Sequence, residues 1–150
     1  MRIQDRKTVI RLVRNKQELR DVFAIREAVF MREQHVSAAL EWDGLDDTTK
    51  HVILFFRRKP VGCARIRFVH KKIKLERIAI LKGYRGLGLG RKIMNYLLRY
   101  CARRPEREII LHAQVAVVPF YEKFGFRRRG KEFLDARIPH VEMYRLKKKY

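Results

Sequence analysis

The chain has 150 residues, of which 47% are hydrophobic, a length and composition that fit one domain with a real core and argue against a disordered chain. Its 37 lysines and arginines against 16 acidic residues give a net charge of +21. No apolar run is long enough to span a membrane, and the polar residues 1–6 do not resemble a signal peptide. Cys63 and Cys101 form no CxxC pair and are interpreted as core residues in a reducing compartment, so we expect a cytoplasmic protein.

The basic residues are spread over the whole chain in short clusters. These clusters are 57–59, 71–72, 103–104, 127–129 and 147–149. Such scatter is typical of a generally basic proteome, and the alternative is an acidic partner such as nucleic acid, an acidic protein or an anionic membrane surface. Aromatic residues do not alternate with the charges as a base-stacking surface requires, so nucleic-acid binding stays a minor alternative.

The first half of the chain predicts a strand, a helix and then three more strands. Residues 8–13 alternate as a strand does, and Asn15 followed by Glu18 is an N-cap signal for a helix that runs to about Phe30. Residues 37–50 contain Gly44 and four acids and are expected to form a loop. Strands are predicted over 51–56, 61–69 and 73–80, with turns at 57–60 and 71–72.

The second half predicts a helix over 88–102, a strand over 107–115 and a helix over 117–124. A further strand begins at 126–129, a loop is expected around 130–139, and 140–146 closes the sheet. No repeat, low-complexity tract or linker divides the chain, so residues 1–150 are expected to form one domain.

Three glycines at alternate positions, Gly86, Gly88 and Gly90, join the strand that ends near residue 81 to the following helix. Glycines let successive amides point the same way, and a helix N-terminus offers unpaired donors to an anion, ideally a pyrophosphate. The triphosphate loop is excluded because its lysine and hydroxyl are missing, and the GxGxxG dinucleotide pattern is not met. What remains is Arg-x-x-Gly-x-Gly from Arg85, or else a turn that only caps strand and helix.

Arg85, Gly88 and Gly90 resemble the acyl-CoA pyrophosphate loop of the GNAT superfamily of N-acetyltransferases. A second block supports this resemblance. The string Pro-Phe-Tyr-Glu-Lys-Phe-Gly-Phe, at 119–126, follows a buried strand about 30 residues after the glycine loop and is similar to a second signature of the same superfamily. The resemblance covers nearly the whole chain and is most specific over 75–126.

The resemblance implies an α/β (α+β) fold with a mixed, twisted sheet of about seven strands, helices on both faces and the order β-α-β-β-β-α-β-α-β-β. It also implies acetyl-CoA as co-substrate, with its arm between two splayed strands and no metal. The residues assigned to CoA are Ile78, Ala79, Ile80, Arg85, Gly86, Leu87, Gly88, Leu89, Gly90, Arg91, Lys92, Gln114, Phe120 and Tyr121.

The same resemblance assigns chemical roles. Tyr121 occupies the position of the family's general acid, with a residue packed under the cofactor as the alternative, and the backbone N–H of Ile80 would stabilise the oxyanion. Glu76 is one candidate for the general base, and the other candidates are Glu33 and a water relay. The alternative for Glu76 is an ordinary solvated or ion-paired carboxylate. Strand alternation is expected to point Arg77 away from Glu76. Gln114 would contact cofactor or acceptor, or be a satisfied core residue, and His112 on the same face is read as structural.

The segment from Ala28 to His51 is similar to the ElaA-like subgroup, which has VFxxEQ, an acidic ExDxxD loop and then a His. The resemblance places Phe30, Glu33, Gln34 and Asp43 at the acceptor end of the cleft, where carboxylates would suit a cationic amine. A metal site at Asp43, Asp46, Asp47 and His51 is disfavoured, because the spacing matches neither an EF-hand nor a zinc motif.

The sequence therefore predicts an acetyl-CoA-dependent N-acetyltransferase that acts on a small-molecule or peptide amine. The alternatives are a catalytically silent acyl-CoA sensor or scaffold and a basic nucleic-acid-associated protein. The acceptor is not identified by the fold, and a homodimer is left open.

Overall fold

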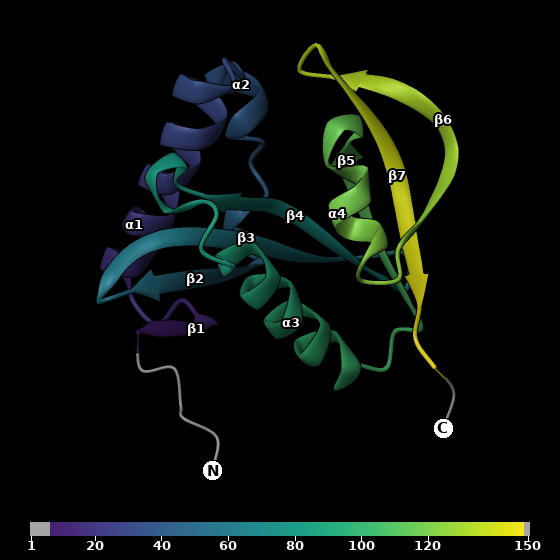
Figure 1. The fold of residues 1–150 in the computed structure, drawn as a ribbon, viewed down its shortest axis with the longest axis horizontal. Coiled ribbons are helices and arrows are strands. Elements are labelled where there is room, and N and C mark those ends of the chain that lie inside the picture. Colours follow the sequence, from purple (N-terminus) through teal and green to yellow (C-terminus); the bar gives the residue numbers. More distant parts are fainter. Residues whose placement is uncertain (1–6, 149–150) are drawn as a thin grey trace.

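Seven strands form one mixed, twisted sheet in the computed structural model, which describes residues 7–148 (Figure 1). Residues 1–6 and 149, which entered the sequence analysis, lie outside the described residues. The strands are β1 (Thr8–Leu12), β2 (Lys50–Phe56), β3 (Lys59–Val69), β4 (Lys72–Ile80), β5 (Glu108–Gln114), β6 (Arg127–Asp135) and β7 (Ile138–Leu146). Their order in the sheet is β1-β2-β3-β4-β5-β7-β6, and only β4 and β5 pair in parallel.

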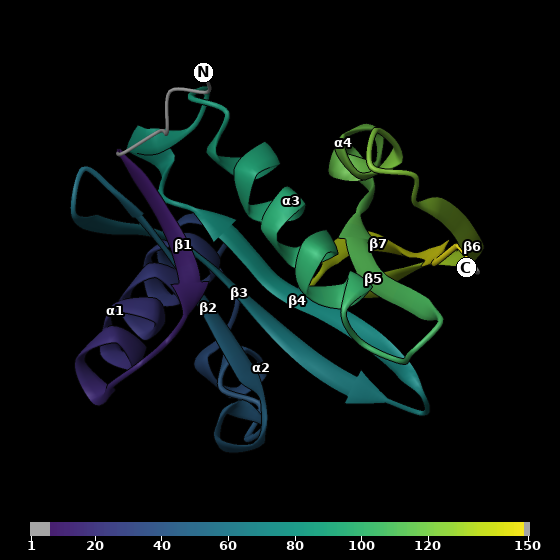
Figure 2. The same ribbon diagram turned by 90° about the horizontal axis from the view of Figure 1, so that it is seen from below.

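Helices cover both faces of this sheet. The α-helices are α1 (Lys16–Arg26), α2 (Ala38–Glu41), α3 (Leu89–Ala102) and α4 (Val118–Glu122). A π-helical segment, η1 (Glu27–Glu33), continues α1, and 3-10 turns occupy Asp46–Thr48, Lys82–Tyr84 and Val115–Val117. Figure 2 shows α1 and α2 on one side of the sheet and α3 and α4 on the other. The predicted fold and element order are confirmed.

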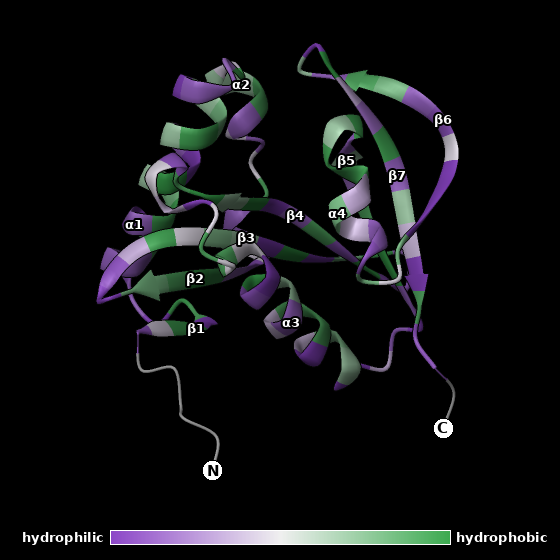
Figure 3. Cartoon of the chain, in the orientation of Figure 1, coloured by the Kyte–Doolittle hydropathy of each residue, from purple (hydrophilic) through white to green (hydrophobic). Residues whose placement is uncertain are grey.

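Two apolar clusters, one on each face, hold these layers together. Because strand side chains alternate, Ile53 of β2 packs with Val22 and Ile25 of α1, whereas its neighbours Val52 and Leu54 join the cluster of α3. Green, apolar positions run through the inner strands, and purple, polar ones cover much of β6 (Figure 3). No helix within residues 7–148 has the length and apolar character that a membrane crossing requires.

The predicted ends of the first helix are partly right. The Asn15 side chain caps α1 by accepting from the Glu18 amide at 2.9 Å. The α-helix ends at Arg26, and the chain then continues as the π-helical segment to Glu33 rather than stopping near Phe30. The expected loop at 37–50 contains α2, whose N-cap Ser37 accepts from the Leu40 amide, and a 3-10 turn.

The loop expected at 130–139 is wrong. β6 runs through Asp135, and only Ala136 and Arg137 turn the chain, at φ 50° and 65°, into β7. β6 is an edge strand that pairs only with β7, so most of its side chains are exposed and it carries no apolar alternation. A polar edge strand of this kind has the same composition as a loop.

Candidate functional site

β4 and β5 begin as a parallel pair and then splay apart. Their pairing runs from Lys72 opposite Glu108 to Leu75 opposite Leu111 and stops there. Two residues later Arg77 has φ 53°, and the register between β3 and β4 shifts by one residue, so β4 bulges where the strands separate. A cleft of about 1120 Å³ opens at this point.

The backbone of Ile80 faces the splay. The Leu81 amide donates to the Val61 carbonyl on β3 at 2.8 Å, and successive residues of a strand point their amides to opposite sides, so the Ile80 amide points away from β3. The Ile80 carbonyl, on the same side as its amide, accepts from Nε of Arg85 at 3.0 Å. By the same alternation Ile78 faces the splay and Ala79 turns its backbone toward β3. The edge of β4 thus presents backbone groups to the cleft as an added strand would need them.

The glycine loop places the N-terminus of α3 at one end of the cleft. Gly86 and Gly88 adopt φ +81° and +77°, and no atom lies within 4 Å of where their Cβ atoms would be. The first bond of α3 runs from the Lys92 amide to the Gly88 carbonyl at 3.2 Å, so the amides of the three residues between are the unpaired donors of a helix start. The geometry fits a pyrophosphate, because the donors are grouped and the space beside Gly86 and Gly88 is open.

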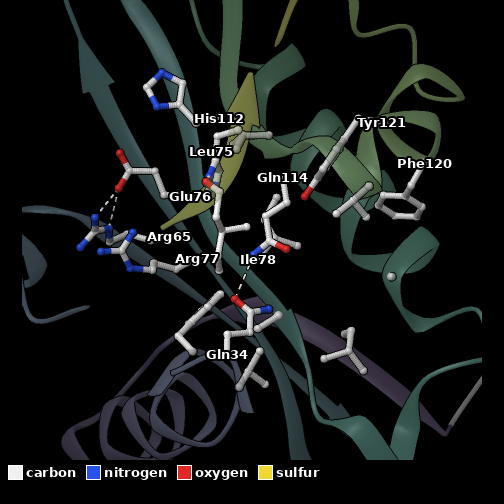
Figure 4. Close-up of a pocket in the computed structure, with 18 of the residues that line it drawn as sticks. Gln34, Arg65, Leu75, Glu76, Arg77, Ile78, His112, Gln114, Phe120 and Tyr121 are labelled. Atoms are coloured by element: carbon white, nitrogen blue, oxygen red, sulfur yellow. Dashed lines mark hydrogen bonds and ion pairs between the residues drawn. The ribbon is translucent and has the colours of Figure 1, made fainter. Parts of the chain in front are cut away.

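Tyr121 extends from α4 toward Gln114, with its hydroxyl directed into the cleft (Figure 4). Its ring packs edge to face on that of Phe120, with 5.2 Å between the ring centroids. The Phe120 ring in turn lies 3.4 Å from the point where a Cβ atom on Gly90 would be. Burial raises the pKa of Tyr121 to about 12. The phenol is therefore neutral at physiological pH and available as a hydrogen-bond donor.

Two polar contacts link the end of the π-helical segment, Glu33 and its C-cap Gln34, to the walls of the splay. Nε2 of Gln114 donates to Oε1 of Gln34 at 2.9 Å (Figure 4). Arg85 donates to both oxygens of Glu33, at 2.6 and 2.8 Å, and this hydrogen bonding holds the pKa of Glu33 below its usual value. Gln114 is thus hydrogen-bonded within the protein, and Glu33 is committed to an ion pair.

The other end of the cleft is built on an ion-pair network of five cations and four carboxylates. Its members are Arg26, Arg65, Arg67, Lys74 and Arg77 with Glu41, Asp43, Asp46 and Glu76. Buried Arg65 lies at its centre: it contacts Asp43 at 2.7 Å, Asp46 at 3.0 Å and Oε2 of Glu76. Arg26 pairs with Glu41 at 2.7 Å and with Asp46 at 2.6 Å.

Arginines keep the carboxylates of this network ionised and balance their negative charge. Burial opposes ionisation of Asp43, Asp46 and Glu76, but hydrogen bonds from Arg26, Arg65 and Arg67 outweigh it and hold all three pKa values below their usual range. For Glu76, the ion-paired alternative of the sequence analysis describes the structure, since both of its oxygens are engaged. Asp43 and Asp46 likewise form ion pairs with arginines.

Most of the predicted site residues line the cleft, but Glu33, Leu87 and Lys92 do not. Lys92 instead directs its ammonium to Oγ1 of Thr8, at 3.4 Å. Those that line it are Phe30, Gln34, Asp43, Glu76, Ile78, Ala79, Ile80, Arg85, Gly86, Gly88, Leu89, Gly90, Arg91, Gln114, Phe120 and Tyr121.

The expectation that Arg77 points away from Glu76 is wrong. The bulge breaks the alternation, so the Arg77 side chain lies beside Arg65, the partner of Glu76 (Figure 4). Nη2 of Arg77 is 3.4 Å from the Asp43 carboxylate, which also binds Arg65.

The sequence analysis missed the basic lining of this end. Arg67 and Lys74 line the cleft from β3 and β4. The signal was present, because Arg65 and Arg67 are two residues apart on a strand and so share a face. His112, read as structural, also lines the cleft, with Nε2 3.5 Å from Glu142.

Comparison with known proteins gives one consistent result. The family model of the acetyltransferase (GNAT) domain matches residues 13–147. An uncharacterized N-acetyltransferase of Bacillus subtilis, YjcF, is 43% identical over 133 residues, which cover 88% of this chain and 95% of that protein. The crystal structure of Escherichia coli ElaA superimposes with a TM-score of 0.83 at 24% identity, covering 92% of this chain and 99% of ElaA. An Arabidopsis thaliana protein solved with the bisubstrate analogue CoA-Ac-MVNAL gives a TM-score of 0.70 at 19% identity, over 93% of this chain and 98% of that one.

Proposed function

Because this chain belongs to the GNAT acetyltransferase family, we propose that it transfers an acetyl group from acetyl-CoA to a primary amine by direct attack in a ternary complex. The observation that carries the proposal is the backbone of Ile80, which faces a splay between β4 and β5 directly beside the glycine loop. The likeness in fold to a protein solved with a CoA analogue supports it.

The residues present fit a CoA molecule along the cleft. Ile78 and Ile80 would hydrogen-bond the amides of the pantetheine arm as a neighbouring strand does, and Ala79 adds its small side chain to the lining. The amides from Leu87 to Arg91 would bind the pyrophosphate, helped by the positive end of α3 and by the charge of Arg91. Bound there, acetyl-CoA supplies an activated acetyl thioester.

Two groups of the chain would act on the reaction itself. The Ile80 amide stabilises the negative charge that develops on the thioester oxygen. Tyr121 donates a hydrogen bond to the departing sulfur. A thiol has a pKa near 8.5, well below the value of about 12 for Tyr121, so the phenol stabilises the thiolate as a donor and need not surrender its proton outright.

The route by which the acceptor amine loses its proton follows from the ion pairs. Glu76 is engaged by Arg65 and Arg67, and Glu33 by Arg85, so neither carboxylate has the free, raised-pKa form that suits a general base. We assign this step to water in the cleft. The amine then reacts as the neutral fraction present in solution or formed by proton transfer to water.

The proposal is tested by thiol release from acetyl-CoA with polyamines, aminoglycosides, amino acids and lysine peptides. Tyr121→Phe is expected to lower kcat by roughly 10²–10³-fold, the effect of removing one donor to a developing negative charge, with little change in the KM for acetyl-CoA. Tyr100→Phe, on α3 and away from the cleft, is the matched control and is expected to keep wild-type rates. Equal rates in Tyr121→Phe and wild type would remove Tyr121 from its role. Tight binding of acetyl-CoA without thiol release for any amine would favour a sensor.

A further inference from the structure

The acceptor end of the cleft carries more accessible positive than negative charge. The ion-pair network has five cations for four carboxylates, and the excess is concentrated around Glu76. Oε1 of Glu76 lies 2.6 Å from Nη2 of Arg67 and 3.5 Å from the ammonium of Lys74, while Oε2 serves Arg65. One carboxylate is thus shared by three cations.

Two of the cations around Glu76 are also more exposed than the glutamates, which adds to the excess of accessible positive charge. The side chains of Glu41 and Glu76 are 2% and 7% exposed, whereas those of Arg67 and Lys74 are 24% and 18% exposed. Asp43 is more open, but its two oxygens accept from Arg65 at 2.9 and 2.7 Å and it also receives the Leu45 amide. A molecule that enters this end therefore meets cationic donors, and the carboxylates it could have paired with are already engaged.

The CoA phosphates do not account for these cations. Figure 4 shows Arg65 and Glu76 on one side of the cleft and Phe120, which contacts the start of α3, on the other, with Ile78 and Gln114 between them. The glycine loop, where the phosphates are proposed to bind, therefore lies across the reaction centre from Arg67 and Lys74. Their position is that of the acceptor, on the far side of the thioester.

We propose that the acceptor is an amine that carries a carboxylate on the same small molecule, and that Arg67 and Lys74 bind this carboxylate. The inference rests on the proposed function, which makes the second group of this molecule an amine that is acetylated. Within residues 7–148, Arg67 uses Nε and Nη2 on Glu76, which leaves Nη1 for a ligand, and Lys74 makes one long ion-pair contact of 3.5 Å. A charge-assisted bond from arginine to a carboxylate is strong and directional, and the lysine ammonium adds a point charge beside it, so the pair can orient the amine toward the acetyl group.

This replaces the expectation that carboxylates at the acceptor end suit a cationic amine. That expectation counted the acids at 41–47 without the arginines that the fold brings to them from β3 and β4. With those arginines in place, a polyamine would be repelled by like charge. The site then favours an acceptor with a negative group in place of a polycationic one.

The test compares amines that differ only in the charged group: glycine, β-alanine and γ-aminobutyrate, each against its carboxamide. Wild type is expected to prefer the carboxylate of at least one pair by 10-fold or more in kcat/KM. Arg67→Gln and Lys74→Gln are each expected to reduce that preference by about 10-fold. The KM for acetyl-CoA should not change. Lys59→Gln, an exposed position outside the cleft, makes the same change in net charge and is expected to leave the preference intact.

A binding measurement makes the outcome independent of turnover and of the amine pKa. Calorimetry with CoA-loaded protein compares the N-acetylated products of each carboxylate and carboxamide pair, and melting temperatures confirm that the variants are folded. Thiol release with polyamines or carboxamides alone would overturn the inference and leave the acetyltransferase standing. Preferential binding of acetylated carboxylates without thiol release for any amine would support the inference and overturn the enzyme. An unchanged preference in both Arg67→Gln and Lys74→Gln would remove these residues from the acceptor site.

Discussion

Substitution of Gly88 by alanine separates the role of the glycine loop in binding from its role in folding. Gly88 adopts φ +77°, so an alanine there is strained by about 1 kcal/mol, which corresponds to a fall of roughly 2–4 °C in melting temperature for a domain of this size. No atom lies within 4 Å of the added methyl group, so no clash increases this cost. The loss of stability should be small.

The loss of ligand affinity should be much larger. The methyl group would occupy the open space above the start of α3, and relief of the strain would turn the neighbouring amides away from the proposed pyrophosphate. Loss of one charge-assisted hydrogen bond costs about 1.5–3 kcal/mol, or roughly a 10- to 150-fold increase in the Kd of CoA. Pantetheine, which has no pyrophosphate, should bind Gly88→Ala as it binds wild type.

Gly130→Ala is the matched control, because Gly130 in β6 has φ +81° and equally open surroundings. Calorimetric titration of CoA into wild type and both variants, with thermal unfolding of each, checks the prediction. Unaltered CoA affinity in Gly88→Ala would refute the reasoning, as would an equal loss in Gly130→Ala, since the effect would then come from backbone strain alone.

Three further predictions concern the ionisable groups. Because the pKa of Tyr121 is raised to about 12, the pH profile of kcat should rise as the amine deprotonates and show no falling limb below about pH 10; a limb near pH 8 would contradict this. Arg65→Met should destabilise the protein by about 3–5 kcal/mol in urea titrations, because it removes a buried cation that Asp43, Asp46 and Glu76 share, whereas Arg20→Met on the surface of α1 should change stability by no more than about 0.5 kcal/mol. Asp43, Asp46 and Glu76 have folded pKa values below their unfolded ones, so their contribution to stability is complete above roughly pH 4.5 and is lost as the pH falls through the folded values; unfolding free energies that stay constant down to pH 3 would argue against it.

Sequence patterns predicted those parts of the fold that depend on local chemistry. The Asn15 cap, the apolar run of β2 and the glycines before α3 each specify a structure within a few residues, and the fold follows them. The start of β6 was predicted at 126–129, but its second half escaped prediction because an exposed edge strand needs no apolar alternation. The bulge of β4 also escaped, since Arg77 is an ordinary residue for a strand and gives no sign of its positive φ.

The candidate site divides in the same way. The end proposed to bind CoA is specified by two contiguous blocks of sequence, which sequence analysis identifies directly. The end proposed to bind the acceptor depends on ion pairs between residues far apart in sequence, such as Arg65 with Asp43 and Arg77 with Glu41. The residues were visible in the chain, but their partners are set by the packing of α1 and α2 against the sheet, so the sign of the accessible charge could not be obtained from composition.

The bulge at Arg77 connects these two ends. A non-glycine residue at φ 53° is strained and persists only where its surroundings fix it. Here the guanidinium of Arg77 lies 3.1 Å from Glu41 and 3.4 Å from Asp43, and its carbonyl accepts from the Cys63 thiol. The ion-pair network that defines the acceptor end therefore also holds the distortion that separates β4 from β5. Changes that remove the partners of Arg77, Glu41 and Asp43, should therefore disturb the proposed binding of the CoA arm as well as that of the acceptor, whereas Arg67 and Lys74 form their ion pairs with Glu76 rather than with these two carboxylates and can be changed without this effect.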